Sequence, residues 1–93
     1  MKADEAIAHT ERLLLKVGKW DWTVQVVPFT DYPDRFGAAS SQRKCIDLNP
    51  VYLADEAEMR ETIAHEVAHA MTVGDNEHGL PFQAALAYCR KKL

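Results

Sequence analysis

Three residues in one short segment carry side chains that can do chemistry together. Residues 62–69 read TIAHEVAH, which places His65 and His69 four residues apart with Glu66 directly after the first histidine. On an α-helix, residues four apart share a face, and their Cβ atoms are about 5–6 Å apart. Both imidazoles can then direct a nitrogen at one Zn²⁺ ion, at about 2.0–2.1 Å from it. The pattern therefore predicts a zinc site on a helix.

Glu66 occupies a different direction from the two histidines. With about 3.6 residues per turn, it points about 100° round the helix from His65. It cannot easily join the same pair of ligands, but its carboxylate can reach a water bound to the metal. His-Glu-x-x-His peptidases divide the work in this way, with two ligands and one general base. We therefore expect Glu66 to be the catalytic base of a metal-assisted hydrolysis.

A catalytic zinc ion usually has a third protein ligand and one open position. His78 is the best candidate for that ligand, because Gly74 lets the chain leave the helix and the following loop can bring His78 back. Asp75 and Glu77 lie in the same loop and are its rivals. The final segment PFQAALAYCRKKL contains no acid, which argues against a glutamate ligand on a following helix.

The proposed hydrolysis also needs a group that stabilises negative charge on the attacked carbonyl oxygen. Tyr52, Tyr88, Arg43 and Arg60 are conceivable, but nothing in their spacing selects one of them. A surface or packing role is the more ordinary expectation for each of the four. The sequence therefore leaves this role unassigned.

The first half of the chain predicts a helix followed by strands. Residues 3–17 have the apolar periodicity of an amphipathic helix, and Gly18 is placed to end it. The stretch WTVQVVPF alternates in polarity as a strand does, and its proline closes it. The stretch AASSQRKCIDL can form a short hairpin that turns near residues 41–43.

The second half predicts two helices. Asp55 and Glu58 form a capping-box-like start to a helix that runs to about Thr72, and Pro81 fits the first turn of a last helix. The order helix, strands, helix, helix is typical of an α+β domain. We therefore expect residues 1–93 to form a single domain with a short, mainly antiparallel sheet, an active-site helix and a C-terminal helix.

The composition is that of a globular protein and gives no sign of a nucleic-acid or membrane partner. The 93 residues carry a net charge of −3, so no overall attraction to nucleic acid is expected. No stretch approaches the roughly 20 apolar residues that span a bilayer, and the charged N-terminus lacks the apolar block of a signal peptide. The two cysteines, Cys45 and Cys89, form neither a disulfide framework nor a zinc ribbon. We therefore expect a cytoplasmic protein, and the sequence leaves its oligomeric state open.

With these residues in place, the sequence resembles the SprT-like family of zinc metallopeptidases. The family's signature is His-Glu-x-x-His on a helix, then a third histidine followed by glycine and, shortly after, an aromatic residue. The positions that match it are His65, Glu66, His69, His78, Gly79 and Phe82. The segment RKCIDLNPVYL also resembles the family's strand and its approach to the active-site helix.

The resemblance implies that the three histidines are zinc ligands and that Glu66 is the catalytic base. It also implies a small zincin-like domain, whose sheet has an edge strand along which a polypeptide substrate can lie. Many relatives carry a C-terminal zinc ribbon, for which this chain has no cysteines. Some cleave proteins crosslinked to DNA with separate DNA-binding elements, and the acidic balance of this chain does not indicate such a substrate.

Three functions are compatible with such a zinc site, and the residues favour a minimal zinc-dependent peptidase. A non-peptidase hydrolase that acts on another amide or ester would use the same chemistry at the metal. A zinc-stabilised binding module would have no need of Glu66, and a structural zinc site normally has a fourth protein ligand such as cysteine. In favour of the binding module, a chain of 93 residues has few residues to form the sides of a substrate cleft.

Overall fold

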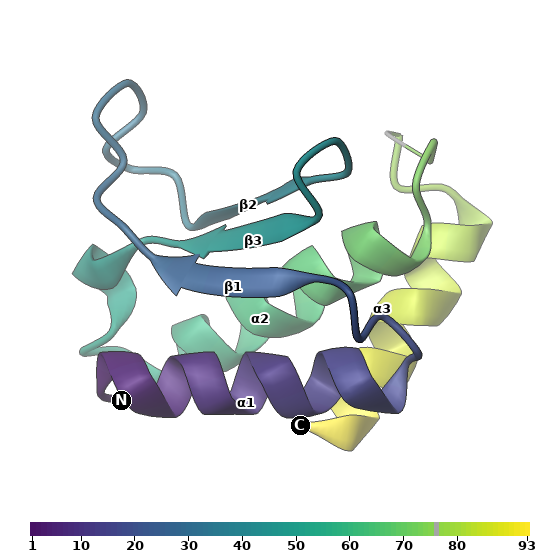
Figure 1. Cartoon of the computed structure of the whole chain (residues 1–93), viewed down its shortest axis with the longest axis horizontal. Coiled ribbons are helices and arrows are strands. Elements are labelled where there is room, and N and C mark those ends of the chain that lie inside the picture. The colour runs from purple at the N-terminus through teal and green to yellow at the C-terminus, as the bar shows by residue number, and fades with distance from the viewer. Residues whose placement is uncertain (76) are drawn as a thin grey trace.

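The elements follow the predicted order of helix, strands, helix and helix (Figure 1). The computed structural model describes residues 1–75 and 77–93. Within those residues the elements are α1 (Ala3–Lys16), β1 (Thr23–Val26), β2 (Gly37–Ser40), β3 (Cys45–Leu48), the 3₁₀ turn η1 (Pro50–Tyr52), α2 (Glu56–Met71) and α3 (Leu80–Lys92). The predicted α+β class is confirmed.

Local sequence signals account for the ends of the helices. The carboxylate of Asp55 accepts a hydrogen bond from the backbone N–H of Glu58 at 3.1 Å, which is the predicted N-terminal cap of α2. Gly18 and Gly74 follow α1 and α2 with φ angles of 77° and 101°, a region that residues with a Cβ atom rarely adopt. Pro81 lies in the first turn of α3, where its missing N–H is not needed.

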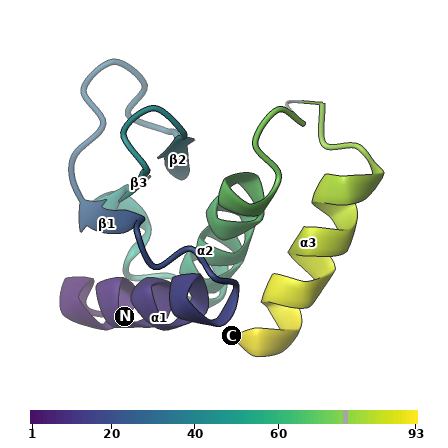
Figure 2. The same ribbon diagram turned by 45° about the vertical axis from the view of Figure 1, so that its right-hand side comes forward.

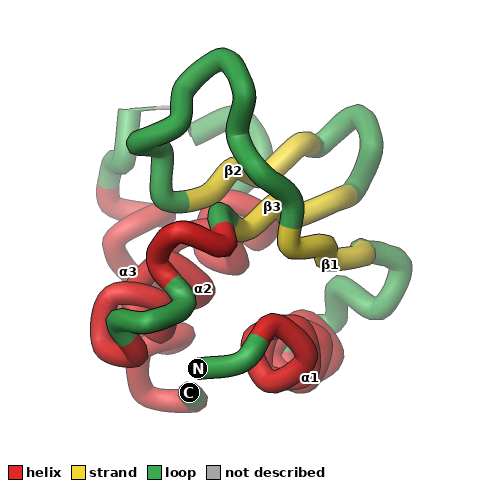
Figure 3. Tube along the Cα trace, turned by 90° about the vertical axis from the view of Figure 1, so that its left-hand side faces the viewer, coloured by secondary structure: helices red, strands yellow, loops and turns green. Residues whose placement is uncertain are grey.

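The sheet is mixed, whereas the sequence predicted a mainly antiparallel one. Its strand order is β1-β3-β2. β2 and β3 form the predicted antiparallel hairpin, with Gly37 opposite Leu48 and Ser40 opposite Cys45. β1 pairs with β3 in parallel. The difference arises because the connection through residues 27–36 rises above the sheet and delivers β2 to the far side of β3 (Figure 3).

The helices lie on one side of the sheet (Figure 1), and α3 packs on the flank of α2 (Figure 2). Between these layers is a core whose largest fully buried side chains include Leu13, Leu14, Ile46, Leu48, Met59, Ile63, Val67 and Phe82. Because β2 and α3 both pack against α2, the middle of α2 is enclosed by a strand edge and by the last helix. Among the described residues, no helix combines the length and apolar character that crossing a bilayer requires.

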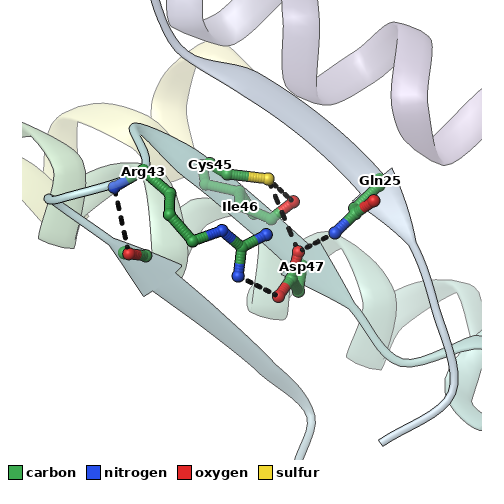
Figure 4. Close-up of polar contacts among 6 residues, drawn as sticks. Gln25, Arg43, Cys45, Ile46 and Asp47 are labelled. Atoms are coloured by element: carbon green, nitrogen blue, oxygen red, sulfur yellow. Dashed lines mark hydrogen bonds and ion pairs between the residues drawn. The ribbon is translucent and has the colours of Figure 1, made fainter.

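The opposite face of the sheet carries a small polar network (Figure 4). The carboxylate of Asp47 accepts a hydrogen bond from the side-chain amide of Gln25 at 2.8 Å, and it lies 3.8 Å from the guanidinium of Arg43. The thiol of Cys45, which is buried, lies 3.5 Å from the same carboxylate. This network accounts for Arg43 and Cys45 as structural residues of the sheet.

Candidate metal centre

Three imidazoles converge at the C-terminal end of α2. The Nε2 atom of His69 lies 3.2 Å from Nε2 of His65 and 3.0 Å from Nε2 of His78. Four ligands at the zinc–imidazole distance in tetrahedral geometry lie about 3.3 Å from one another. An imidazole nitrogen carries either one proton or one lone pair, so Nε2 of His69 cannot form full hydrogen bonds with both neighbours. A shared cation accounts for both short contacts, and the three residues therefore fit a zinc ion.

Burial favours the neutral form of His65 and His69. Burial, followed by the charges of His65 and His78, lowers the pKa of His69 to about 4. Burial, followed by His78, lowers the pKa of His65. A neutral ring presents a lone pair, and this is the form that binds a metal ion.

Phe82 of α3 orients the three rings. It is almost fully buried, and its ring centroid lies 5.1 Å from that of His65 and 4.5 Å from those of His69 and His78. An aromatic side chain packed against all three imidazoles restricts their rotation and excludes water from one side of them. The last helix therefore contributes a packing surface beneath the imidazoles, although it supplies no ligand atom.

The loop that carries His78 is held by Asp75. The Asp75 carboxylate accepts hydrogen bonds from the backbone N–H groups of Gly79 at 3.0 Å and Phe82 at 3.1 Å. These bonds, that of Gly79 first, lower the pKa of Asp75. His78 itself has a φ angle of 56°, an uncommon conformation that histidine tolerates better than most residues. Asp75 therefore has a role at the start of α3 and is not placed as the third ligand.

Glu77, the other rival of His78, is exposed. Among the described residues, the group of three or more His, Cys, Asp or Glu side chains that lie close enough to share one ion is His65, His69 and His78. The structure thus brings together the three histidines that the sequence singled out.

Glu66 lies beside the histidines and is only 7% exposed. Burial raises the pKa of Glu66 to about 7, and the positive charge of Arg35 opposes this shift. The helix and the strand are in close contact at this point: a Cβ atom on Gly37 would lie 2.9 Å from Cγ2 of Thr62 and 3.1 Å from Cγ of Glu66. Glycine at the start of β2 therefore lets the strand edge approach the glutamate.

A cavity of about 560 Å³ lies between β2 and α2. Glu66 and all three histidines line it, together with Gly37 and Ala39 of β2 and the preceding Arg35. The arrangement places a carboxyl that titrates near neutrality, a fitted metal site and an open strand edge around one space.

The comparisons with known proteins identify the family. The model of the SprT-like family matches residues 6–93, which is nearly the whole chain. The chain belongs to the SprT-like family. No curated protein and no solved structure matched it. The family resemblance that the sequence motif indicated is confirmed.

Four residues of this SprT-like chain were considered as groups that stabilise the negative charge on the carbonyl oxygen. None of them lines the cavity: they are Tyr52, Tyr88, Arg43 and Arg60. Three have partners elsewhere: Arg43 pairs with Asp47, Arg60 pairs with Glu56, and the Tyr52 hydroxyl donates to the backbone oxygen of Asp34. The ring of Tyr88 lies beneath the ammonium group of Lys92.

Sequence reasoning missed Arg35 and Gly37, which do line the cavity. Arg35 stands in a segment rich in turn-forming residues, where spacing assigns no direction to a side chain. For Gly37 there was a signal, because a glycine at a strand position often marks the close approach of another part of the chain.

Proposed function

We propose that this SprT-like chain is a zinc-dependent metallopeptidase, with residues 1–93 as its single catalytic domain. His65, His69 and His78 hold the ion, and Glu66 is the general base. A zinc ion in such a site supplies a Lewis acid, which makes water more acidic and polarises a carbonyl oxygen. The observation that carries the proposal is the convergence of three imidazoles beside a buried carboxyl group in one cavity.

Glu66 moves the proton in this mechanism. Its carboxylate takes a proton from the attacking water and later delivers it to the nitrogen of the leaving amine. A general base works best when its pKa lies near the working pH, and burial brings the pKa of Glu66 to about 7. Phe82 packs against the three histidine rings and holds them in position for the ion.

The outer edge of β2 is the proposed place for the peptide. β2 is an outer strand of the sheet. The backbone oxygen of Phe36 accepts a hydrogen bond from Asn49, and Ala38 is opposite Asp47, so the alternation of an antiparallel pair turns Gly37 and Ala39 away from β3. Both residues line the cavity, and the N–H of Gly37 with the N–H and C=O of Ala39 can pair with an extended substrate. This edge favours a polypeptide substrate over a small amide or ester.

The binding module without turnover is the less favoured alternative. It accounts for the three imidazoles, but it gives no reason to keep an acidic side chain buried beside them at a cost in stability. Cys45 and Cys89 are both buried free thiols, in keeping with the reducing cytoplasm that we propose as the compartment.

Substitution of Glu66 tests the proposal. Glu66→Gln removes the base and leaves the ligands, so we expect the variant to keep its fold and its zinc content and to lose cleavage of an unfolded, carboxymethylated test protein. Zinc is measured by elemental analysis, and cleavage is followed by mass spectrometry with and without a chelator. Glu56→Gln, which removes the same charge from an exposed position of α2, is the control and should cleave like the wild type. Equal cleavage by wild type and Glu66→Gln would refute the proposed role.

A further inference from the structure

Arg35 is placed to act on the substrate from the strand side of the cavity. It lies immediately before β2, and its Nε atom donates a hydrogen bond to the backbone oxygen of Gly37 at 3.1 Å. That oxygen faces away from β3, as the pairing of β2 requires. The guanidinium group is therefore held along the outer edge of β2, beside the position where Gly37 meets Glu66.

The charge of Arg35 reaches both halves of the proposed catalytic site. It lines the same cavity as Glu66 and the three histidines. Arg35 is the sole lysine or arginine among the described residues that line the cavity, and no described carboxylate forms an ion pair with it. Its terminal nitrogens are thus available to a ligand.

The two threonine hydroxyls of the cavity are less suitable for an anion. The hydroxyl of Thr62 donates to the backbone oxygen of Glu58, and the hydroxyl of Thr72 donates to that of Ala68. Both protons are therefore already used inside α2. A guanidinium group adds a full positive charge and a planar set of N–H donors, which suits an oxygen that becomes negative.

We propose that Arg35 is a catalytic residue that stabilises the negative charge on the carbonyl oxygen of the scissile peptide. The inference rests on the proposed peptidase function. Water oxygen forms a bond to the carbonyl carbon while Glu66 takes its proton, and the electron pair of the C=O π bond moves to the carbonyl oxygen. Arg35 donates hydrogen bonds to that oxygen and gives up no proton. The C–N bond then breaks as the C=O bond re-forms, and the proton on Glu66 passes to the leaving nitrogen.

The backbone of Arg35 is fixed by contacts that do not involve its side chain. Asn49 is 3% exposed, and its side-chain amide donates hydrogen bonds of 2.8 Å to the backbone oxygens of Pro33 and Arg35. The backbone N–H of Arg35 donates to the oxygen of Tyr32 at 3.0 Å. The guanidinium therefore starts from a fixed Cα position, and its replacement should leave the fold intact.

Kinetics of Arg35 variants test the role. We expect Arg35→Gln to lower kcat by about 10²–10³-fold with little change in KM, which is the usual effect of removing one donor to such an oxygen. Arg35→Lys keeps the charge but lacks the planar set of N–H donors, so its kcat should lie between those of the wild type and Arg35→Gln. Arg60→Gln, at a half-buried position of α2 outside the cavity, is the matched control and should match the wild type. Zinc content should be the same in all four proteins.

A binding measurement separates stabilisation of charge from binding of the peptide. A phosphinic peptide, whose tetrahedral anion imitates the attacked bond, should bind Arg35→Gln more weakly by about the factor lost in kcat/KM. The matched substrate peptide, which Glu66→Gln is expected not to cleave, should bind this variant and the double variant Arg35→Gln/Glu66→Gln equally well. Cleavage that depends on Glu66 but is unaffected in Arg35→Gln would overturn the role of Arg35 alone. Cleavage that does not depend on Glu66 would overturn the peptidase proposal, and the role of Arg35 with it.

Discussion

Asn49 and Glu66 are both buried polar side chains near the cavity, and they are satisfied very differently. Asn49 is fully engaged: it donates to the backbone oxygens of Pro33 and Arg35, and it accepts from the N–H of Val51. Glu66 lines the cavity, burial raises its pKa, and no hydrogen bond from a described group is among the causes that set this pKa. A buried polar group with all its partners holds a fold together, whereas one without them is costly and is kept for another reason.

The contrast also separates the two walls of the cavity. The α2 wall carries the ionisable chemistry on one rigid helix, where spacing along the chain fixes the relative positions of the side chains. The β2 wall carries the strand edge and one cation, and both depend on the buried amide of Asn49 in the turn that follows β3. Chemistry at the metal and handling of the substrate are thus assigned to different segments.

Removal of the Asn49 amide should destabilise the protein. Asn49→Ala loses three hydrogen bonds and leaves two carbonyl oxygens without a donor, so we expect the free energy of unfolding to fall by about 2–3 kcal/mol. Urea unfolding measures this change. Amide exchange should also become faster in residues 32–36, because the loop that carries Arg35 loses its anchor.

Asn49→Asp sharpens this test. The aspartate keeps the oxygen that accepts from Val51 but places a carboxylate against the oxygens of Pro33 and Arg35, so it should be at least as unstable as Asn49→Ala. A variant at this position with wild-type stability would show that the buried amide does not hold the β2 wall, and the comparison would fail.

Removal of the Glu66 charge should instead raise the stability of the metal-free protein. The pKa of about 7 in the folded state exceeds the ordinary glutamate value of 4.5, so the folded state binds the proton more tightly and loses stability as pH rises from about 4.5 to about 7. Glu66→Gln should therefore match the wild type below pH 4.5 and exceed it by up to about 3 kcal/mol above pH 7.

Thermal unfolding in the presence of a chelator, at several pH values, measures this difference. Glu56→Gln is the control, since its carboxylate is exposed and pairs with Arg60. It should change stability by less than about 1 kcal/mol and with no gain at high pH. If Glu66→Gln were destabilising above pH 7 in the metal-free protein, Glu66 would be a structural group like Asn49.

The difference between the α2 wall and the β2 wall also explains which parts of the site the sequence could predict. His65, Glu66 and His69 lie on one helix, whose periodicity converts spacing into direction, so their proximity followed from the sequence alone. His78 required the chain to turn back after Gly74, and the loop does so with Asp75 as its anchor. That anchoring role was not predicted, because an acid in such a loop is equally compatible with metal ligation.

The β2 wall was less accessible to sequence reasoning. The hairpin followed from local alternation, but the parallel pairing of β1 with β3 depends on the path of residues 27–36, which no local signal fixes. No local signal indicates the role of Asn49, because its partners lie 14 and 16 residues away along the chain. Arg35 owes its place to that anchoring and to the close approach at Gly37, and both are tertiary contacts.

Zinc K-edge X-ray absorption of the zinc-loaded protein tests the central claim most directly. For the wild type the account predicts a first shell of nitrogen and oxygen at about 2.0 Å, with outer-shell scattering from three imidazoles. In His78→Asn, which keeps a residue that tolerates the backbone conformation at this position, two imidazoles should remain. A sulfur neighbour at about 2.3 Å, or an imidazole count that His78→Asn leaves unchanged, would contradict the account.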